Sequence, residues 1–241
     1  MVKHRARALP HHLDGVSMLS RRWKIGLISF AVVVFLSVFA FVIFQPVQVL
    51  PRVRLAPGFI LTDQSGRRLT SEDVRGKFAL YSFTYTNCPP PCGGIDATMQ
   101  AVQNQLDEIA LYGNEVEFVT ISIDPERDTP EALARHAAYL GAGPTWRFAT
   151  TENQNALKDI VGGGFRTFYE QQDDGTFLLD PGIVLVDGYG IIRNEYRYET
   201  VSPDVDRIVR HIGILAEEVE KSTGAASLAY EAAHLFLCYS P

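Results

Sequence analysis

Residues 78–112 read FALYSFTYTNCPPPCGGIDATMQAVQNQLDEIALY, and this stretch decides the fold. Its opening, 78–85, is mostly apolar and aromatic, which predicts a buried strand. Over 95–112 apolar residues recur every three or four positions, which predicts an amphipathic helix. Two cysteines, Cys88 and Cys92, lie between them with three prolines in the gap. The chain therefore places a cysteine pair where a strand ends and a helix begins.

Strands and helices continue to alternate after this stretch. We expect an opening hairpin over 59–61 and 67–70, strands over 116–123, 146–149, 183–187 and 191–198, and helices over 130–140, 153–161 and from Ser202 onward. Alternation of this kind indicates βαβ units and a mostly parallel sheet, and the closing hairpin adds an antiparallel edge. The predicted fold class is α/β with a thioredoxin-like fold, a central mixed sheet flanked by helices. We expect this domain to span 57–222.

A transmembrane anchor is expected over 25–44. This run, IGLISFAVVVFLSVFAFVIF, has no charged residue, and at about 1.5 Å per residue it matches the roughly 30 Å hydrocarbon core of a bilayer. The apolar part of a cleaved signal peptide, the competing interpretation, is shorter. The basic segment 1–24 should stay in the cytoplasm. A spacer over 45–56 then leads to a domain on the periplasmic side of the inner membrane, and a helix-prone tail follows over 223–241.

Charge excludes one class of partner. The chain carries a net −6, but its first 24 residues hold six basic side chains against Asp14 alone, so the remainder carries −11. An acidic domain does not favour nucleic acid, because such binding requires neutralisation of phosphates. Cationic partners or metal ions are compatible with this charge.

The cysteine pair has the properties of a reactive site. A thiol at a helix amino terminus is shifted towards thiolate by the helix dipole and by unpaired backbone N–H groups. Thiolate is both the nucleophile of disulfide exchange and a soft ligand for Cu(I). Three intervening residues allow the sulfurs of Cys88 and Cys92 to meet, as a disulfide or on one ion. An inert structural disulfide or two buried thiols are the alternatives, which prolines in a surface loop disfavour.

Two motifs together resemble the SCO/SenC family. The first is T-x-C-P-x-x-C over 86–92, and the second, more discriminating one is S-x-D-P-x-R-D-T-P over 122–130. The resemblance covers 57–222, and an amino-terminal anchor is also usual in that family. It implies a thioredoxin fold and a role in assembling the copper site of cytochrome c oxidase, by carrying copper, by reducing oxidase cysteines, or by both. The partner it implies is an oxidase subunit or another exported cysteine protein.

Part of the second motif has a structural explanation. Asp128 and Glu131 resemble a capping box at the start of the next helix, and Pro130 suits a first helical turn. Capping leaves Asp124 unexplained, at the carboxyl end of a strand where sites of α/β proteins gather. We therefore assign Asp124 a supporting role at the site.

The sequence departs from the family at the third copper ligand. Copper-binding members add one histidine ahead of a late strand, and an ungapped match places that histidine on Leu179. Asp180 is a weak substitute, because a carboxylate suits Cu(I) poorly. Pro181 instead resembles the cis-proline of thioredoxin-type reductases, whose loop helps to bind substrate. These differences favour thiol redox chemistry over copper carriage as the function. Binding of Cu(I) by Cys88 and Cys92 is the alternative that the sequence leaves open.

Several functions remain open from the sequence. The first is a thiol–disulfide oxidoreductase, in which Cys88 attacks and Cys92 resolves, either for oxidase assembly or as a general reductase with no copper role. The second is a copper-binding module without redox activity. A thiol peroxidase of the same fold needs threonine where Tyr85 stands, and a protein that has lost activity is a further alternative. A His234/Cys238 pair in the tail offers only a weak metal site.

Overall fold

The structure, a computed structural model, describes residues 14–44, 48–89, 93–197, 204–222 and 230. It divides into two compact units, Met1–Pro46 and Val47–Pro241. The first holds α1 (Asp14–Phe44), a 31-residue helix that begins ahead of the predicted apolar run. Within it, Arg21–Phe39 is long and apolar enough to cross a membrane, a criterion that a signal sequence near an amino terminus also meets. The predicted apolar helix is therefore present.

The second unit is built on an eight-stranded mixed sheet in the order β1-β10-β9-β4-β5-β6-β2-β3. Its strands are β1 (Arg54–Leu55), β2 (Ile60–Asp63), β3 (Arg68–Thr70), β4 (Phe78–Thr84), β5 (Val116–Ser122), β6 (Trp146–Thr150), β9 (Gly182–Val186) and β10 (Ile191–Arg197). Only β4, β5 and β6 run parallel, and the other five pairings are antiparallel. The expectation of a mostly parallel sheet is wrong, because helical crossovers join only β4 to β5 and β5 to β6 in parallel, whereas hairpins join β2 to β3 and β9 to β10.

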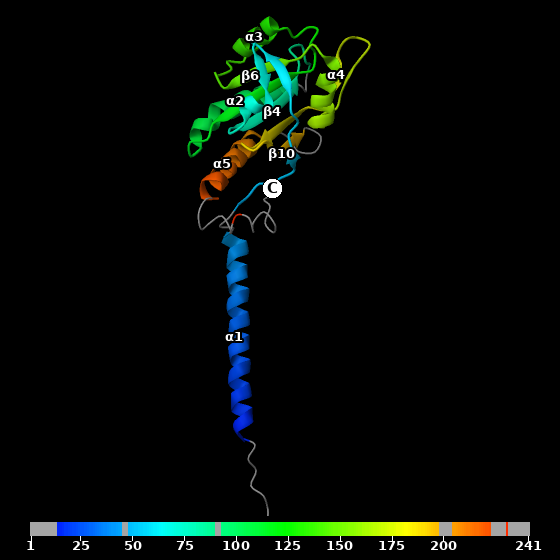
Figure 1. Cartoon of the computed structure of the whole chain (residues 1–241). Coiled ribbons are helices and arrows are strands. Elements are labelled where there is room, and N and C mark those ends of the chain that lie inside the picture. Colours follow the sequence, from blue (N-terminus) through cyan, green and yellow to red (C-terminus); the bar gives the residue numbers. More distant parts are fainter. Residues whose placement is uncertain (1–13, 45–47, 90–92, 198–203, 223–229, 231–241) are drawn as a thin grey trace, which may run out of the picture. The chain divides into compact units, whose positions relative to one another are not determined.

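Helices cover both faces of this sheet. They are α2 (Gly93–Gln105), α3 (Pro130–Tyr139), α4 (Gln154–Leu157), α5 (Val205–Lys221), the 3₁₀ turns η1 (Ser71–Val74) and η2 (Leu106–Glu108), and the π-helix η3 (Lys158–Gly164). Side chains of β4 alternate between two cores. Phe78 and Leu80 pack with α2, α3 and α5, whereas Tyr81 and Phe83 pack with β2, β3, α4 and η3. Figure 1 shows α2 (green) and α5 (orange) side by side on one face, with α4 apart from them.

Two regions differ from the predicted elements. The helix expected over 95–112 ends at Gln105 and passes into η2, because the chain must reverse at Tyr112 and Gly113, which have φ values of 50° and 81°. A second, two-stranded sheet of β7 (Tyr169–Gln171) and β8 (Phe177–Leu179) was not predicted. Each of its strands has only three residues, too few for a period of two to be evident.

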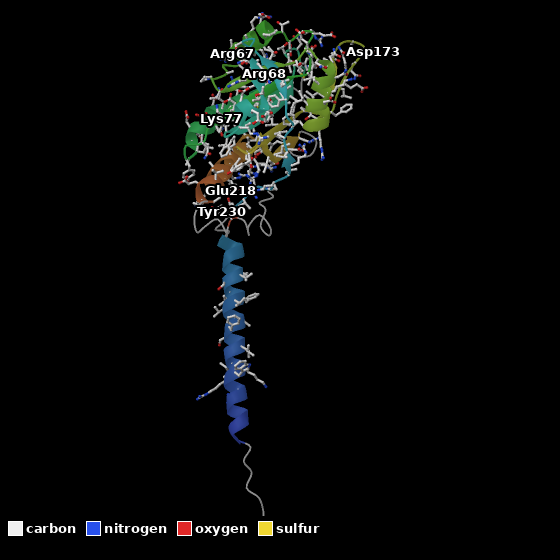
Figure 2. All side chains as sticks on the ribbon, viewed as in Figure 1. Arg67, Arg68, Lys77, Asp173, Glu218 and Tyr230 are labelled. Carbon is white, nitrogen blue, oxygen red and sulfur yellow. The ribbon has the colours of Figure 1, made fainter. Side chains whose placement is uncertain are left out.

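The segment expected as a spacer contributes to the domain. Val49 and Leu50 are fully buried, and β1 pairs with β10. Arg193 donates to the Leu50 carbonyl at 2.6 Å and pairs with Glu218 on α5 at 2.7 Å. Glu218 in turn accepts the Leu50 N–H at 3.2 Å. Tyr230, labelled beside Glu218 in Figure 2, packs against Val49, while the rest of the 223–241 tail lies outside the described residues.

Candidate functional site

Cys88 lies in the turn that follows β4. Its N–H donates to the Tyr85 carbonyl at 3.0 Å. Its half-buried side chain packs against the hydrophobic core that contains Tyr81 and Phe83. Cys88 is disulfide-bonded. Its partner is Cys92 or Cys238, the other two cysteines of the chain, and both lie outside the described residues. Helix α2 begins at Gly93, so the cysteine segment leads directly into a helix amino terminus.

Asp128 holds the segment that precedes Cys88. The buried carboxylate of Asp128 accepts the Thr86 N–H at 3.0 Å and also the hydroxyls of Thr86 and Ser122. It therefore ties the cysteine turn to the end of β5. The capping box expected from Asp128 is not formed: the N-cap of α3 is Thr129, whose hydroxyl accepts the Ala132 N–H at 3.4 Å. Sequence reasoning missed this role, because Thr86 and Asp128 lie far apart in the chain.

Asp124 faces the β7–β8 hairpin. Its buried carboxylate forms an ion pair with Arg127, which also donates to the Gly175 carbonyl in the hairpin turn. The Arg127 guanidinium lies 6.0 Å from the centre of the Phe177 ring, within the range of a cation–π contact. Asp124 and Arg127 thus connect the 122–130 motif to the hairpin.

The hairpin also contacts the strand that carries the cysteine turn. The Phe177 N–H donates to the Tyr85 hydroxyl at 3.3 Å, and the two rings lie 5.1 Å apart edge to face. Tyr85 is buried at the position where a peroxidase would need threonine. The contact brings β8 to the cysteine turn, a neighbour that no sequence signal indicated.

The sequence places Asp180 and Pro181 between this hairpin and β9. Strands β4 and β9 pair with Ser82 opposite Ile183. Continuing this antiparallel register puts Pro181 opposite Thr84, at the end of β4 from which the cysteine turn departs. Pro181 is buried.

The carboxylate of Asp180 is already engaged. Its Oδ2 forms an ion pair with Arg197 at 3.1 Å, and its backbone N–H donates to the Phe168 carbonyl at 2.9 Å. Its Oδ1 is buried without a hydrogen-bond partner in the described part of the chain. Leu179, where the family histidine is expected, packs half-buried against the same core as Cys88. A metal at Asp180 would compete with Arg197 for the carboxylate.

The two described histidines serve other contacts. His136 on α3 pairs with Asp96 on α2 at 2.9 Å. His211 on α5 is fully buried, and its Nδ1 lies 2.8 Å from the Tyr196 hydroxyl. Burial, with nearby Arg210 and Arg207, lowers the pKa of His211 to about 4. Among the described residues, no group of three or more His, Cys, Asp or Glu side chains could hold a metal ion. His234 and Cys238 lie outside them.

Several known proteins are similar to this chain in sequence or in structure. The human mitochondrial SCO1 homologue is 30% identical over 130 residues, covering 53% of this chain but only 42% of its own length. A Stutzerimonas stutzeri protein, provisionally named as copper-binding, is 27% identical over 166 residues, 69% of this chain and 80% of that protein. The structure of BsSco, a member of the Sco family of cytochrome c oxidase assembly proteins, matches with a TM-score of 0.60 and 22% identity over 71% of this chain and 98% of its own.

The fold is therefore thioredoxin-like, as predicted. The family model described as SCO1/SenC matches residues 48–214, well over half of the chain. The chain belongs to the SCO1/SenC family, and the resemblance carried by its two motifs is confirmed. The matched region starts at residue 48, which agrees with the burial of Val49 and Leu50 in the domain.

Proposed function

We propose that this protein assists assembly of the copper site of cytochrome c oxidase through a reversible dithiol formed by Cys88 and Cys92. The observation that carries the proposal is a disulfide-bonded Cys88 in a turn fixed by Asp128, ahead of the amino terminus of α2. A disulfide in this position is exposed enough to be exchanged, since Asn87 and Pro89 beside Cys88 are both exposed. Family membership supports the biological process.

In the reduced protein, the Cys88 thiolate attacks one sulfur of a disulfide in the partner protein. A Cys88–partner disulfide forms, and the second partner sulfur leaves as a thiolate. The Cys92 thiolate then attacks the Cys88 sulfur, which closes a Cys88–Cys92 disulfide and releases the first partner sulfur. The partner gains two electrons and this protein loses two, so a dithiol reductant in the same compartment must restore the pair.

Copper is the cargo in this scheme rather than a resident cofactor. Two thiolates can hold Cu(I), which accepts soft ligands at low coordination number. Asp180, whose Oδ2 is paired with Arg197, offers only a hard carboxylate oxygen, which suits Cu(I) poorly. We therefore propose that Cu(I), if carried, is held by Cys88 and Cys92 alone and passes to thiolates of the partner.

The remaining assignments follow from this scheme. We propose that 25–44 anchors the protein in the inner membrane with 1–24 in the cytoplasm and the domain in the periplasm. The partner is an oxidase subunit or another exported cysteine protein. We assign contact with the partner segment to the loop at Pro181, opposite the end of β4 by strand register, and a supporting role to Asp124 through Arg127.

A general disulfide reductase without a copper role is the second candidate. The observation that favours it is Leu179 in place of the family histidine, packed against the core rather than presented as a ligand. Both candidate functions require a reactive Cys88 thiol, and they differ only in whether the protein binds copper.

Titration of the reduced full-length protein with Cu(I), in competition with a chromophoric chelator, tests the proposal. Copper carriage predicts one Cu(I) per chain, lost in both Cys88→Ser and Cys92→Ser and retained in the matched control Cys238→Ser. Failure of the unmodified protein to compete for Cu(I) would exclude copper carriage and leave the reductase. Retention of Cu(I) by both single variants would overturn the dithiol site.

A further inference from the structure

The outer edge of β7 carries backbone groups that no other described element pairs. In the β7–β8 pair, the Asp180 N–H donates to the Phe168 carbonyl at 2.9 Å and the Gln172 N–H donates to the Thr176 carbonyl at 2.8 Å. Hydrogen-bonded pairs alternate along antiparallel strands, so the backbone groups of Tyr169 and Gln171 point away from β8. Within the described residues, no backbone bond joins these outward groups to another element.

A groove runs along this same edge. It has a volume of about 530 Å³ and is lined by all of 168–171 but by Phe177 alone from β8. The rest of its lining comes from Gln154, Leu157 and Lys158 and from residues 123–126 at the end of β5. The groove therefore borders β7 along its whole length and touches β8 at one residue, and it lies at the carboxyl end of a parallel strand, where α/β proteins bind their ligands.

The groove lining combines apolar side chains with acidic ones. Ile123, Leu157 and Phe177 supply apolar surface. Glu126 and Glu170 are exposed carboxylates on the lining, whose basic side chain is Lys158. Asp173, labelled at the tip of the hairpin in Figure 2, adds a further carboxylate to the hairpin that carries β7. An occupant with positive charge is therefore favoured over an acidic one.

The groove is linked to the cysteine turn through Tyr85. Phe177, on the groove lining, donates its N–H to the Tyr85 hydroxyl, and the Tyr85 carbonyl accepts the Cys88 N–H. Tyr169 and Phe177 pack half-buried against the same core as Cys88. A chain segment bound in the groove would thus contact Phe177, which is hydrogen-bonded to the residue three positions before Cys88.

We propose that this groove binds an extended, basic segment of the partner polypeptide, which adds as a further strand to β7. Tyr169 and Gln171 exchange backbone hydrogen bonds with the segment. The apolar side chains of the segment face Ile123, Leu157 and Phe177, and its basic side chains face Glu126 and Glu170. The inference rests on the proposed function, since it supplies the means by which a partner cysteine is held beside Cys88.

Binding of a short, blocked, cysteine-free peptide of alternating valine and lysine to the full-length protein tests the inference. The matched pair Gln171→Pro and Gln171→Ala differ in the outward N–H, and proline is tolerated on an edge strand. We expect Gln171→Pro to weaken binding about tenfold, and Gln171→Ala to leave it within about twofold. Glu170→Lys should also weaken binding, and this test of charge does not depend on the folding of the proline variant.

Backbone N-methylation of the peptide separates strand addition from simple attraction between charges. Loss of binding on methylation supports the inference, whereas equal binding of the methylated peptide or of a valine–glutamate peptide would overturn it. Absence of binding by the parent peptide would overturn it as well. Because the peptide has no cysteine, the Cys88→Ser protein should bind it equally, so failure of the groove and failure of the dithiol chemistry are distinguishable.

Discussion

At the scale of single residues, Asp128 joins two segments that are distant in the chain. Its carboxylate accepts three hydrogen bonds, two from Thr86 and one from Ser122, in a fully buried position. A buried carboxylate with three donors is stable only while all of them remain. The position of the cysteine turn therefore depends on an acid outside the cysteine motif.

Replacement of Asp128 by alanine should destabilise the protein by about 3–5 kcal/mol, because three donors lose a charged acceptor. Asp128→Asn keeps one acceptor oxygen and should cost about 1–2 kcal/mol. Urea unfolding followed by circular dichroism measures both. The control Glu126→Gln, on an exposed side chain, should stay within about 0.5 kcal/mol, and an equally small effect of Asp128→Ala would refute the role given to Asp128.

His211 should make stability depend on pH. Burial, assisted by Arg210 and Arg207, lowers its pKa from 6.5 to about 4, so the unfolded chain binds a proton more readily than the folded one. The free energy of unfolding is therefore highest above pH 6.5 and decreases as the pH falls from 6.5 towards 4. The decrease is about 2 kcal/mol by pH 5. Unfolding free energies at several pH values should show this slope, and His211→Gln should flatten it. An unchanged slope in the variant would contradict the account.

The residue types of the site could be predicted more readily than their partners. Cys88, Cys92 and Asp124 stand out because of their motifs and their places at strand ends. The bonds from Thr86 to Asp128 and from Asp180 to Arg197 could not be predicted, because they join residues whose proximity is created by the sheet. Local patterns also misled at one position: a capping box was expected at Asp128, but the N-cap of α3 is Thr129.

At the scale of elements, the β7–β8 hairpin is held to the domain by contacts with Arg127 and Tyr85. Arg127 bridges Asp124 and the Gly175 carbonyl, and Phe177 rests on Tyr85. The long elements β4, β5 and α5 were predicted, because each is long enough to show its pattern. The hairpin and the early end of α2 were not, because tertiary packing and turn geometry determine them.

Substitution of Arg127 by lysine should loosen this hairpin. Lysine keeps a charge for Asp124 but lacks the planar fork that reaches the Gly175 carbonyl at the same time. Amide exchange over 169–179 should become about fivefold faster, while global stability falls by only about 1 kcal/mol. Hydrogen–deuterium exchange with mass spectrometry measures the exchange rates, and Arg135→Lys, at an exposed position of α3, is the control. Unaltered exchange in the hairpin would show that Arg127 does not hold it.

At the scale of the whole molecule, the domain includes residues that the sequence suggested were a linker. Leu50 is buried, and Arg193, Asp187 and Glu218 form a buried network around its backbone. The composition of 45–56, with its prolines and arginines, gave no sign of this. Only the fold brings β10 and α5 to the segment.

Two soluble forms of the protein test where the domain begins. A form starting at Pro57 loses Leu50 and β1 and leaves Arg193 with fewer partners, so it should be about 3–5 kcal/mol less stable than a form starting at Gln48. Chemical denaturation of the two forms measures the difference. Equal stability would mean that 48–56 does not belong to the folded domain.

Trapping of a mixed disulfide shows whether Cys88 is the attacking thiol. The reduced Cys92→Ser protein is mixed with a peptide whose two cysteines form a disulfide, quenched with acid and mapped by mass spectrometry. We expect a stable adduct on Cys88 that is absent from Cys88→Ser and is released when Cys92 is present. An adduct found only on Cys238, or no adduct on Cys88, would contradict the proposed function.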